Sequence, residues 1–437
     1  MRAGTATQHE RLLRLFRRNA DKAEDAGLTG LHFSGLGDGS SIEVHGRRLV
    51  NFGHCSYLGL STDPRLKQGA VEAIERFGPH YSSSQVYASV DLYSELEDLL
   101  AEMTGCRSVV LPPTTTLGHL ACLPTLVSDG DAVILDSQSH ASLQLTIQVL
   151  AGRGISIRPV AHNDASELER AVATLTGSHR TVWYIGDGVY SMFGDVAPLG
   201  FIAELMGAYD NLHVYLDDAH GFSWQGESGR GHVLSRLRLN ERMVVAAGLG
   251  KAFGSGGAAL FFGDPAAART VAHLGGPMTF SGPVQPPILG ANIASAHIHL
   301  SPEIAALQQR MADQIALVSS LLASHRLPAV SWSQTPIWLV RVGDFDKMLA
   351  VTRRMVDDGF YLNPSAFPAV PVGMAGLRFT HSLHNRDEQI AEMIARLAHH
   401  MGQVVGDFES MVDLTELEAE PPERDSPTRA GSLTRPD

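Results

Sequence analysis

Short apolar runs alternate with amphipathic stretches between residues 109 and 264, and this alternation restricts the possible folds more than any other feature of the chain. The stretches between several runs have helical patterns, as in ASLQLTIQVLAG, SELERAVATL and GFIAELMGAYD. The runs are VVLPP, DAVILD, ISIRPV, TVWYIGDGV, HVYLDDAH, MVVAAG and AALFFGD. Continuous apolar strands joined by helices predict an α/β fold with a mostly parallel sheet buried between helices. Ligands of such sheets bind at the carboxyl ends of the strands, so we expect functional side chains just after these runs.

The pattern changes after about Ala291 to a long helical segment, two short strands (WLVRVG and AGLRFTHS) and a last helix. This predicts a smaller α+β domain, whose last helix begins with Asn385 and Glu388 in capping-box spacing. Beyond about residue 413 the sequence is charged and rich in proline and serine, which predicts disorder. The predicted parts are an N-terminal arm (1–50), a large domain (51–290), a small C-terminal domain (291–412) and a disordered tail (413–437).

The N-terminal arm is expected to contain an amphipathic helix. Its apolar residues lie among arginines at roughly helical spacing, and they are Leu12, Leu13, Leu15 and Phe16. We interpret this helix as an arm that packs on a partner subunit. A helix lying on a membrane surface is the alternative.

The charge and the cysteine content exclude several classes of function. A formal net charge of -13 and the lack of a basic run with interleaved aromatic residues argue against nucleic-acid binding. No signal-peptide pattern and no apolar run of about 18 residues occurs, so we expect neither export nor a membrane span. Cys55, Cys106 and Cys122 have no metal-ligand spacing, which favours reduced thiols in a cytoplasmic protein.

Lys251 lies in the glycine-rich loop AAGLGKAFGSGG, directly after one of the predicted strands. The chain has only four lysines and otherwise uses arginine, which cannot lose its proton at ordinary pH. A partly desolvated amine at this place is a candidate for Schiff-base formation. A lysine that extends its charge to solvent, or one that contacts a phosphate, is the alternative.

Asp217, Asp218 and His220 lie where the run HVYLDDAH ends. A carboxylate there can keep the nitrogen of a heteroaromatic ring protonated, because negative charge raises the pKa of that nitrogen, and His220 can bond to a ring hydroxyl. All three residues are also legitimate metal ligands. A structural capping turn is the third interpretation, and these residues alone do not decide among the three.

Polar side chains follow other predicted strands as well. His140 comes just after DAVILD, where it can lie flat on a planar cofactor or bond to backbone groups. Thr114, Thr115 and Thr116 lie at a strand-to-helix junction, where hydroxyls and free backbone N–H groups suit a phosphate. A simple helix N-cap is the alternative for the threonines. Ser191 follows the run TVWYIGDGV.

Together these stretches resemble the α-oxoamine synthases, which are pyridoxal-phosphate enzymes of the aminotransferase class I/II superfamily with the fold called type I. The resemblance extends from about Asn51 to His400. The matching segments are NFGHCSYLGLSTDPRL, ELEDLLAEMTG, DSQSHASL, AHNDASELERAV, GVYSMFGDVAPL, LDDAHGFSWQGESGRG, GLGKAFGSGGAALF, FSGPVQPP and GLRFTHSLHNRDEQI. It implies a large domain with a mostly parallel mixed sheet and a smaller C-terminal α+β domain.

The resemblance implies pyridoxal 5'-phosphate (PLP) as the cofactor, held by Lys251 as a Schiff base. Asp217 would pair with the pyridine nitrogen, so that the ring acts as an electron sink. His140 would stack on the ring, while His220 and Ser191 would contact its 3-hydroxyl side. Lys251, His140, Asp217 and His220 are therefore the expected catalytic residues.

The resemblance also implies the substrates. Arg378 in GLRFT matches an arginine that binds the carboxylate of an amino acid. The segment FSGPVQPP, with Ser281, matches a stretch that reaches the phosphate in the neighbouring subunit, which implies a homodimer. The implied reaction joins the amino acid to an acyl thioester of coenzyme A or an acyl carrier protein, with decarboxylation, to give an α-amino ketone. Transamination, decarboxylation alone, retro-aldol cleavage or a non-catalytic homologue are the alternatives.

Four places depart from the pattern of the family. Gly248 stands where a phosphate-binding threonine is usual, and the hydroxyls of Thr114 to Thr116, which replace a Ser-Gly-aromatic loop, are candidates to substitute for it. Ser84 stands where an arginine is common, and Cys55 occupies an asparagine position. We assign Ser84 and Cys55 to the substrate side, so these changes bear on which amino acid and acyl donor are used.

Overall fold

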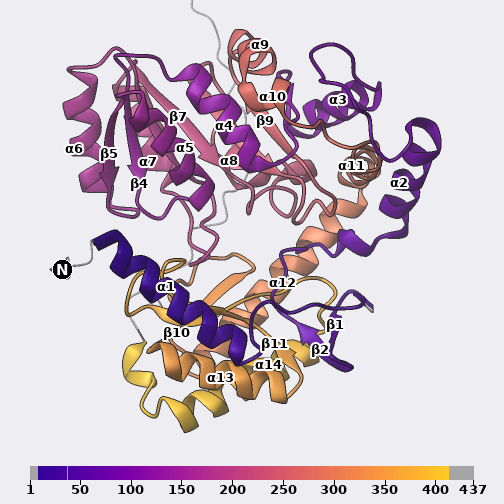
Figure 1. Cartoon of the computed structure of the whole chain (residues 1–437), viewed down its shortest axis with the longest axis vertical. Coiled ribbons are helices and arrows are strands. Elements are labelled where there is room, and N and C mark those ends of the chain that lie inside the picture. The colour runs from indigo at the N-terminus through magenta and orange to yellow at the C-terminus, as the bar shows by residue number, and fades with distance from the viewer. Residues whose placement is uncertain (1–7, 37, 413–437) are drawn as a thin grey trace, which may run out of the picture.

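A seven-stranded sheet forms the centre of the larger lobe in the computed structural model, which describes residues 8–36 and 38–412 (Figure 1). The strand order is β3-β9-β8-β7-β6-β4-β5. Strands β4 to β8 are all parallel, whereas β9 is antiparallel to both of its neighbours. The strands are β3 (Val109–Val110), β4 (Ala132–Asp136), β5 (Ser156–Val160), β6 (Val182–Asp187), β7 (Leu212–Asp217), β8 (Met243–Gly248) and β9 (Ala258–Phe262). Each predicted apolar run contains one of them, so the predicted mostly parallel sheet is confirmed.

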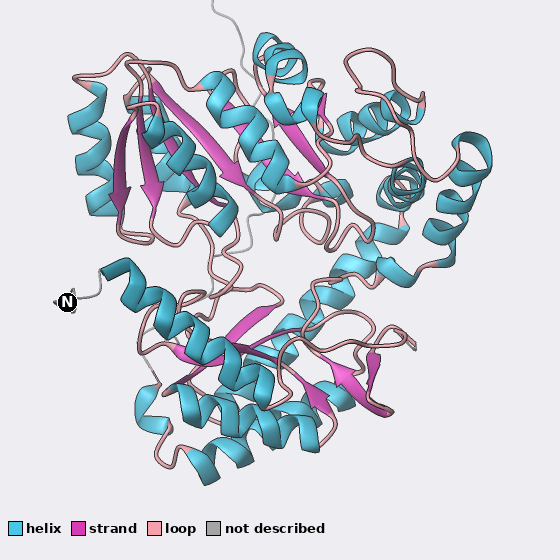
Figure 2. Ribbon diagram, viewed as in Figure 1, coloured by secondary structure: helices cyan, strands magenta, loops and turns pink. Residues whose placement is uncertain are grey.

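Helices cover both faces of this sheet (Figure 2). The strands alternate between two cores, because successive side chains point to opposite faces: Ile134 belongs to one core and Val133 to the other. Both faces are therefore apolar, as buried parallel strands require. The helices of this lobe are α2 (Pro64–Phe77), α3 (Leu92–Thr104), α4 (Thr115–Leu126), α5 (Ala141–Gly152), α6 (Ala165–Thr176), α7 (Leu199–Ala208), α8 (Gly231–Arg236), α9 (Pro265–Leu274), α10 (Gly276–Phe280) and α11 (Pro286–His299).

The smaller lobe contains two short sheets with the helices α13 and α14 below them in Figure 1. One sheet has the order β10-β13-β12 and is antiparallel, and the other has the order β1-β2-β11. Both strands predicted for this lobe are present, as β10 and β13. The elements are β1 (Ser41–Val44), β2 (Arg47–Asn51), β10 (Ile337–Gly343), α13 (Phe345–Asp357), β11 (Phe360–Tyr361), β12 (Asn363–Ser365), β13 (Ala375–Thr380) and α14 (Asp387–Val404). Single 3-10 turns lie at Leu60–Thr62, Glu227–Gly229 and Glu409–Met411.

The long helical segment predicted after Ala291 consists of two helices, α11 and α12 (Glu303–Ser324). They are separated just before Pro302, a residue type that disfavours helix at the position preceding it. Helix α11 packs on α2 so closely that a Cβ added at Gly290 would lie 2.2 Å from the carbonyl oxygen of Gly69. Because α11 belongs to the large lobe and α12 extends into the small one, the interpreted boundary at 290/291 falls inside α11.

The last helix begins differently from the prediction. Gln389 Oε1 accepts the backbone N–H of Arg386 at 2.9 Å, so the reciprocal cap lies one residue later than the predicted pair Asn385 and Glu388. The Asn385 side chain instead accepts the backbone N–H of Ser382 at 3.0 Å. A short polar side chain can serve a preceding turn as well as a helix, and spacing alone does not distinguish the two.

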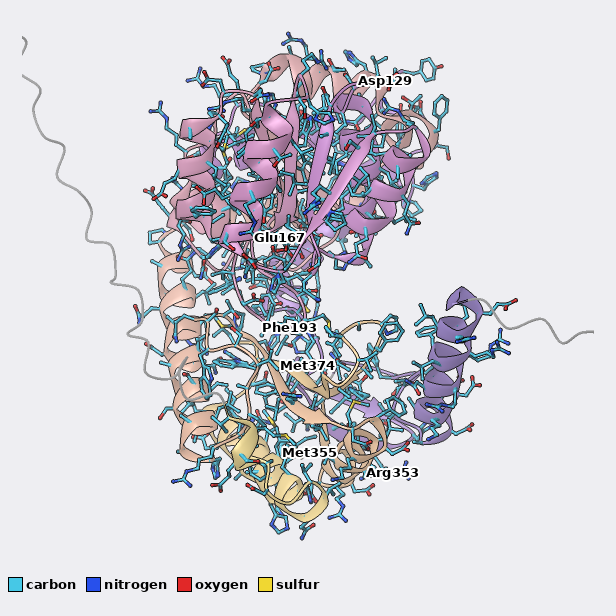
Figure 3. The ribbon with its side chains drawn as sticks, turned by 90° about the vertical axis from the view of Figure 1, so that its left-hand side faces the viewer. Asp129, Glu167, Phe193, Arg353, Met355 and Met374 are labelled. Atoms are coloured by element: carbon cyan, nitrogen blue, oxygen red, sulfur yellow. The ribbon has the colours of Figure 1, made fainter. Side chains whose placement is uncertain are left out.

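The C-terminal end of helix α1 (Gln8–Asp25) lies against the small lobe. There Ala23 is buried and the Lys22 amine pairs with Asp346 on α13 at 2.7 Å. The N-terminal half stands away from the lobe in Figure 3, and its apolar residues Leu12, Leu13 and Phe16 are exposed. No helix in the described part of the chain is long and apolar enough to cross a membrane. The predicted disordered tail lies outside the described residues.

Candidate active site

A cavity of about 240 Å³ lies at the carboxyl ends of the parallel strands. Its position follows from the topology, because Asp187 and Asp217 end the neighbouring strands β6 and β7 in register with each other. Strand β8 ends at Gly248, three positions before Lys251. The lining residues are Thr114, Thr115, Thr116, His140, Ser142, Asp187, Val189, Asp217, Ala219, His220 and Lys251. Seven of these eleven were predicted from the sequence as site residues.

Lys251 projects from a nine-residue loop between the antiparallel strands β8 and β9. Backbone bonds close this loop, since Leu249 N–H donates to Gly257 O at 3.1 Å and Ser255 N–H to Leu249 O at 3.0 Å. The Lys251 amine faces the cavity and has no hydrogen bond or salt bridge within the described residues. Burial lowers the pKa of this amine, and the charge of Asp217 only partly opposes the effect. The amine is therefore less basic than that of a surface lysine.

Asp217 is buried, and both of its oxygens are held. Oδ1 accepts the backbone N–H of Ala219 at 2.9 Å, and Oδ2 lies 3.0 Å from His119 Nε2. Burial alone would raise the pKa of Asp217, but the neighbouring His119 and the Lys251 charge outweigh it, so the pKa lies below its ordinary value. The carboxylate thus stays ionised next to the cavity.

Asp187 is a cavity residue that the sequence analysis missed. It is buried at the end of β6 and accepts the backbone N–H of His140 at 3.1 Å. Burial, and then the charge of Asp217, raise its pKa well above the ordinary value. The pKa values of these two neighbouring carboxylates are therefore shifted in opposite directions. The rule that directed attention to Asp217, a polar residue at a strand end, would also have found Asp187.

Both predicted histidines, His140 and His220, line the cavity. His140 caps α5, where its Nδ1 accepts the backbone N–H of Ser142 at 3.3 Å. One ring nitrogen of His140 therefore bonds to the backbone, as the alternative interpretation of this residue predicted. His220 is buried, and its Nδ1 lies 2.7 Å from the Tyr57 hydroxyl. Burial and the charges of Lys251 and Arg378 lower the pKa of His220 well below the ordinary value. His220 is therefore neutral.

The three threonines form the first turn of α4 and differ in what their hydroxyls do. Thr114 is the N-cap, and its hydroxyl accepts the backbone N–H of Leu117 at 3.1 Å. The hydroxyls of Thr115 and Thr116 have no hydrogen-bond partner in the part of the chain that is described. A Cβ added at Gly248 would lie 3.5 Å from Thr115 Oγ1. The Thr115 hydroxyl thus lies in the direction in which a side chain at position 248 would point.

Arg378, Cys55 and Ser191 form a second group beside the cavity. Arg378 is buried on β13, and its Nε donates to the backbone oxygen of Ser191 at 2.7 Å. Its Nη2 lies 3.9 Å from Cys55 Sγ. Figure 3 places Phe193 and Met374, near the loop after β6 and the start of β13, at the level where the two lobes meet. None of the three residues of this group lines the cavity itself.

Ser84 and Ser281 lie apart from both groups. They line a second hollow of about 240 Å³, together with His80, Ser82, Ser83, Thr279, Phe280, Gly282 and Pro283. The Ser281 hydroxyl donates to the backbone oxygen of Pro277 at 2.6 Å. Large apolar side chains beside this hollow are exposed, with Phe280 at 89% and Tyr87 at 84%. The hollow therefore opens on an apolar surface.

The metal alternative for Asp217, Asp218 and His220 has no support in the geometry. Among the residues that the structure describes, no three His, Cys, Asp or Glu side chains converge as metal ligands. Asp218 is buried, and its Oδ2 accepts the backbone N–H of Val233 at 3.0 Å. It does not line the cavity.

Known proteins resemble this chain over most of its length. Residues 47–397 match the family model described as aminotransferase class I and II. The chain is 33% identical over 375 residues to the 8-amino-7-oxononanoate synthase of Geobacter sulfurreducens, covering 84% of this chain and 92% of that protein. It is 32% identical over 361 residues to the enzyme of the same name from Dechloromonas aromatica, covering 82% and 92%.

Solved structures share the fold. A serine palmitoyltransferase from S. paucimobilis with a bound PLP-myriocin aldimine superposes with a TM-score of 0.82 at 22% identity, covering 92% of this chain and all of that one. An 8-amino-7-oxononanoate synthase from Francisella tularensis has a TM-score of 0.67 at 21% identity, covering 81% and 98%. The predicted α/β fold of PLP-dependent transferases is confirmed.

The chain therefore belongs to the aminotransferase class I and II family. Within this family it is a PLP-dependent enzyme of the α-oxoamine synthase group, as the sequence resemblance predicted.

Proposed function

We propose that this enzyme joins an amino acid to an acyl thioester and releases an α-amino ketone, a thiol and carbon dioxide. The observation that carries the proposal is the unpaired Lys251 amine facing the Asp217 carboxylate across a strand-end cavity, in a chain 33% identical to an 8-amino-7-oxononanoate synthase. PLP, when bound, supplies an aldehyde that links to amines and a ring that withdraws electrons from the α-carbon of the substrate.

The cavity fits this cofactor in three respects. It offers a half-buried amine of lowered pKa, Lys251, for the covalent link. It offers an ionised carboxylate, Asp217, for the ring nitrogen. It also offers two unpartnered hydroxyls, Thr115 and Thr116, at the N-terminus of α4, where a phosphate is favoured by free N–H groups and the helix dipole.

We assign the remaining roles to the residues around these three. With the cofactor bound, His140 would stack on its ring, and His220 and Ser191 would contact its 3-hydroxyl side. The Lys251 amine would act as the base for the α-proton of the substrate, which its lowered pKa favours. Asp187 holds the loop of His140 through the backbone bond described above.

We assign the substrate side to Arg378 and Cys55. The Arg378 guanidinium is buried, with Nε engaged by the Ser191 carbonyl, and it binds the carboxylate of the amino acid. Cys55 lies against the same guanidinium and borders the bound substrate. A thiol at this position accepts and donates weaker hydrogen bonds than an amide, so Cys55 affects which amino acid is taken.

We further propose that the enzyme is a cytoplasmic homodimer. A second copy would cover the hollow that contains Ser84 and Ser281 and bring Ser281 near its phosphate site. The exposed Phe280 and Tyr87 support this, because exposed aromatic side chains around a hollow are typical of protein interfaces. The exposed apolar residues of α1 provide a further surface for the second copy. All three cysteines are unpaired, which suits a reducing compartment.

The test is product analysis with purified holoenzyme. A panel of amino acids is combined with acyl-coenzyme A and acyl carrier protein thioesters, and thiol, carbon dioxide and ketone are measured. Equal release of thiol and carbon dioxide, with an α-amino ketone, is expected. Carbon dioxide without thiol, or formation of a keto acid, contradicts the proposal. Lys251→Ala abolishes every product, whereas Lys67→Ala, which removes an exposed lysine on α2, retains them.

A further inference from the structure

His119 lies directly behind Asp217 and was not singled out by any sequence motif. It is fully buried on α4, with Nε2 3.0 Å from Asp217 Oδ2 and Nδ1 2.7 Å from the Tyr215 hydroxyl. Tyr215 and Asp217 are two positions apart on β7, so both side chains point to the same face of the sheet, the face that α4 covers. One helix residue thus joins two strand residues.

The direction of these hydrogen bonds can be assigned. Tyr215 is fully buried, and burial raises the pKa of its hydroxyl well above the ordinary value, so the phenol keeps its proton. His119 Nδ1 is the only partner of that hydroxyl in the described chain, so the O–H donates to Nδ1. Because Nδ1 accepts from Tyr215, the ring proton lies on Nε2 and is donated to Asp217 Oδ2.

The consequence for Asp217 is a fixed orientation. Its two oxygens receive donors from two separate elements, the His119 ring on α4 and the Ala219 backbone N–H after β7. Rotation of the carboxylate would break at least one of these bonds inside the protein, where an unpaired polar group is destabilising. The remaining acceptor capacity of Asp217 faces the cavity.

We propose that His119 is a positioning residue, which together with Tyr215 holds the Asp217 carboxylate in place and ionised for the ring nitrogen of the cofactor. This inference rests on the proposed pairing of Asp217 with that nitrogen. It does not require the condensation reaction, because it concerns the cofactor-bound enzyme without substrates.

The experiment uses PLP-loaded His119→Leu, His119→Gln and Tyr215→Phe, with His213→Gln as the matched control. His213 lies near the start of the same strand and contacts Trp183 rather than the cavity. The PLP dissociation constant is measured by fluorescence, the cofactor absorbance is titrated with pH, and folding is checked by thermal denaturation.

In His119→Leu we expect the PLP dissociation constant to rise by about 10-fold or more, the equivalent of losing a hydrogen bond to a charged group. The pKa of the absorbance transition should also rise by about one unit. A poorly held carboxylate lets the ring nitrogen lose its positive charge, and without that charge the neighbouring linkage keeps its proton to a higher pH. His119→Gln, whose amide can still donate to Asp217, recovers most of the loss. Tyr215→Phe has a smaller effect in the same direction, and His213→Gln has none.

A folded His119→Leu enzyme with wild-type PLP affinity and pH titration would overturn the proposal. If that variant does not fold, Tyr215→Phe decides, since a wild-type titration in that variant also overturns it. Failure of the condensation reaction in wild-type enzyme would leave these measurements unaffected.

Discussion

Two histidine–aspartate clusters lie at the carboxyl edge of the same sheet, and they use the same residue types differently. In the first, His119 contacts one carboxylate, Asp217, which also lines the cavity. In the second, His162 lies between two carboxylates, with Nδ1 2.9 Å from Asp136 Oδ1 and Nε2 2.6 Å from Asp195 Oδ2. We call the second cluster the clamp.

In the clamp, each ring nitrogen of His162 bonds to a carboxylate. Burial would lower the pKa of His162, but its hydrogen bonds to Asp136 and Asp195 raise that pKa to about 9, so the ring is a cation between two anions. Asn163 completes the cluster by donating to both carboxylates. No residue of the clamp lines the cavity. Around the cavity, by contrast, Lys251 has no hydrogen bond or salt bridge within the described chain.

The difference shows what distinguishes a structural cluster from a reactive one in this molecule. Each contains a buried aspartate, and each contains a group whose pKa is strongly shifted. In the clamp the pKa of His162 is raised by carboxylates that stay in place, so we expect this cluster to stabilise the fold. At the cavity an amine and two hydroxyls have no hydrogen-bond partner among the described residues, and these are the groups that a ligand can satisfy.

The largest expected effect is the loss of activity when Asp217, in the first cluster, is replaced. Asp217→Asn should lower kcat/KM on the order of 10³-fold, about 4 kcal/mol, because an amide cannot hold the positive charge of the ring nitrogen. The free energy of unfolding should fall by about 1–3 kcal/mol, because the amide oxygen accepts only one of the two hydrogen bonds that the carboxylate accepts. Steady-state kinetics and urea unfolding measure the two quantities. An Asp217→Asn enzyme of near wild-type activity would contradict the comparison.

The second prediction reverses the pattern at the clamp. His162→Leu should lower the free energy of unfolding by about 3–5 kcal/mol, because two carboxylates lose the cation between them. The folded fraction should keep a kcat/KM close to that of wild type. Urea unfolding followed by circular dichroism provides the measurement. His273→Leu, at an exposed histidine on α9, is the control and should change little. If His162→Leu and His273→Leu lower the free energy of unfolding equally, the clamp does not contribute to stability.

The third prediction concerns pH. The pKa of His162 is about 9 when folded, against 6.5 for the ordinary side chain, so folding favours the protonated form. Its stabilisation is therefore complete below about pH 6.5 and disappears as the pH rises through 9. The difference in unfolding free energy between wild type and His162→Asn should shrink from pH 6 to pH 10 in urea titrations. A difference independent of pH would refute the assigned charge.

The smallest expected effect concerns the two unpartnered hydroxyls. Thr115→Val should raise the PLP dissociation constant about 5-fold to 10-fold, the loss of one hydrogen bond to a phosphate. Thr114→Val should lose about 1 kcal/mol of stability instead, because its hydroxyl caps α4. Adding Gly248→Ser to Thr115→Val should recover part of the affinity, since position 248 points toward Thr115 Oγ1. If Thr114→Val weakens PLP more than Thr115→Val does, the assignment is wrong.

The sequence predicted the elements of the large sheet because its signals are local. Each apolar run is a strand bounded by turn residues, and the buried face of α14, with Ile390, Met393, Ile394, Leu397 and Met401, follows from its periodicity alone. The cap of that helix was displaced by one residue. Side chains that can serve either a turn or a helix leave such boundaries undetermined.

The candidate site was predicted in part. The strand-end rule located Asp217 and His220, and the resemblance supplied roles for Lys251 and Arg378. His119 could not be found in this way, because its importance depends on α4 packing over β7, a contact between residues almost one hundred positions apart. The separation of Ser84 and Ser281 from the cavity likewise depends on tertiary structure.

The loop that carries Lys251 is pinned at both ends to adjacent strands in the middle of the sheet. A base mounted on such a short closed span cannot travel with its backbone. The amine can move only as far as its four-carbon side chain allows, and it reaches different points only by changing rotamer. The groups that bind the rest of the substrate must therefore place its α-carbon within reach of this amine. A small displacement of the bound substrate lowers kcat.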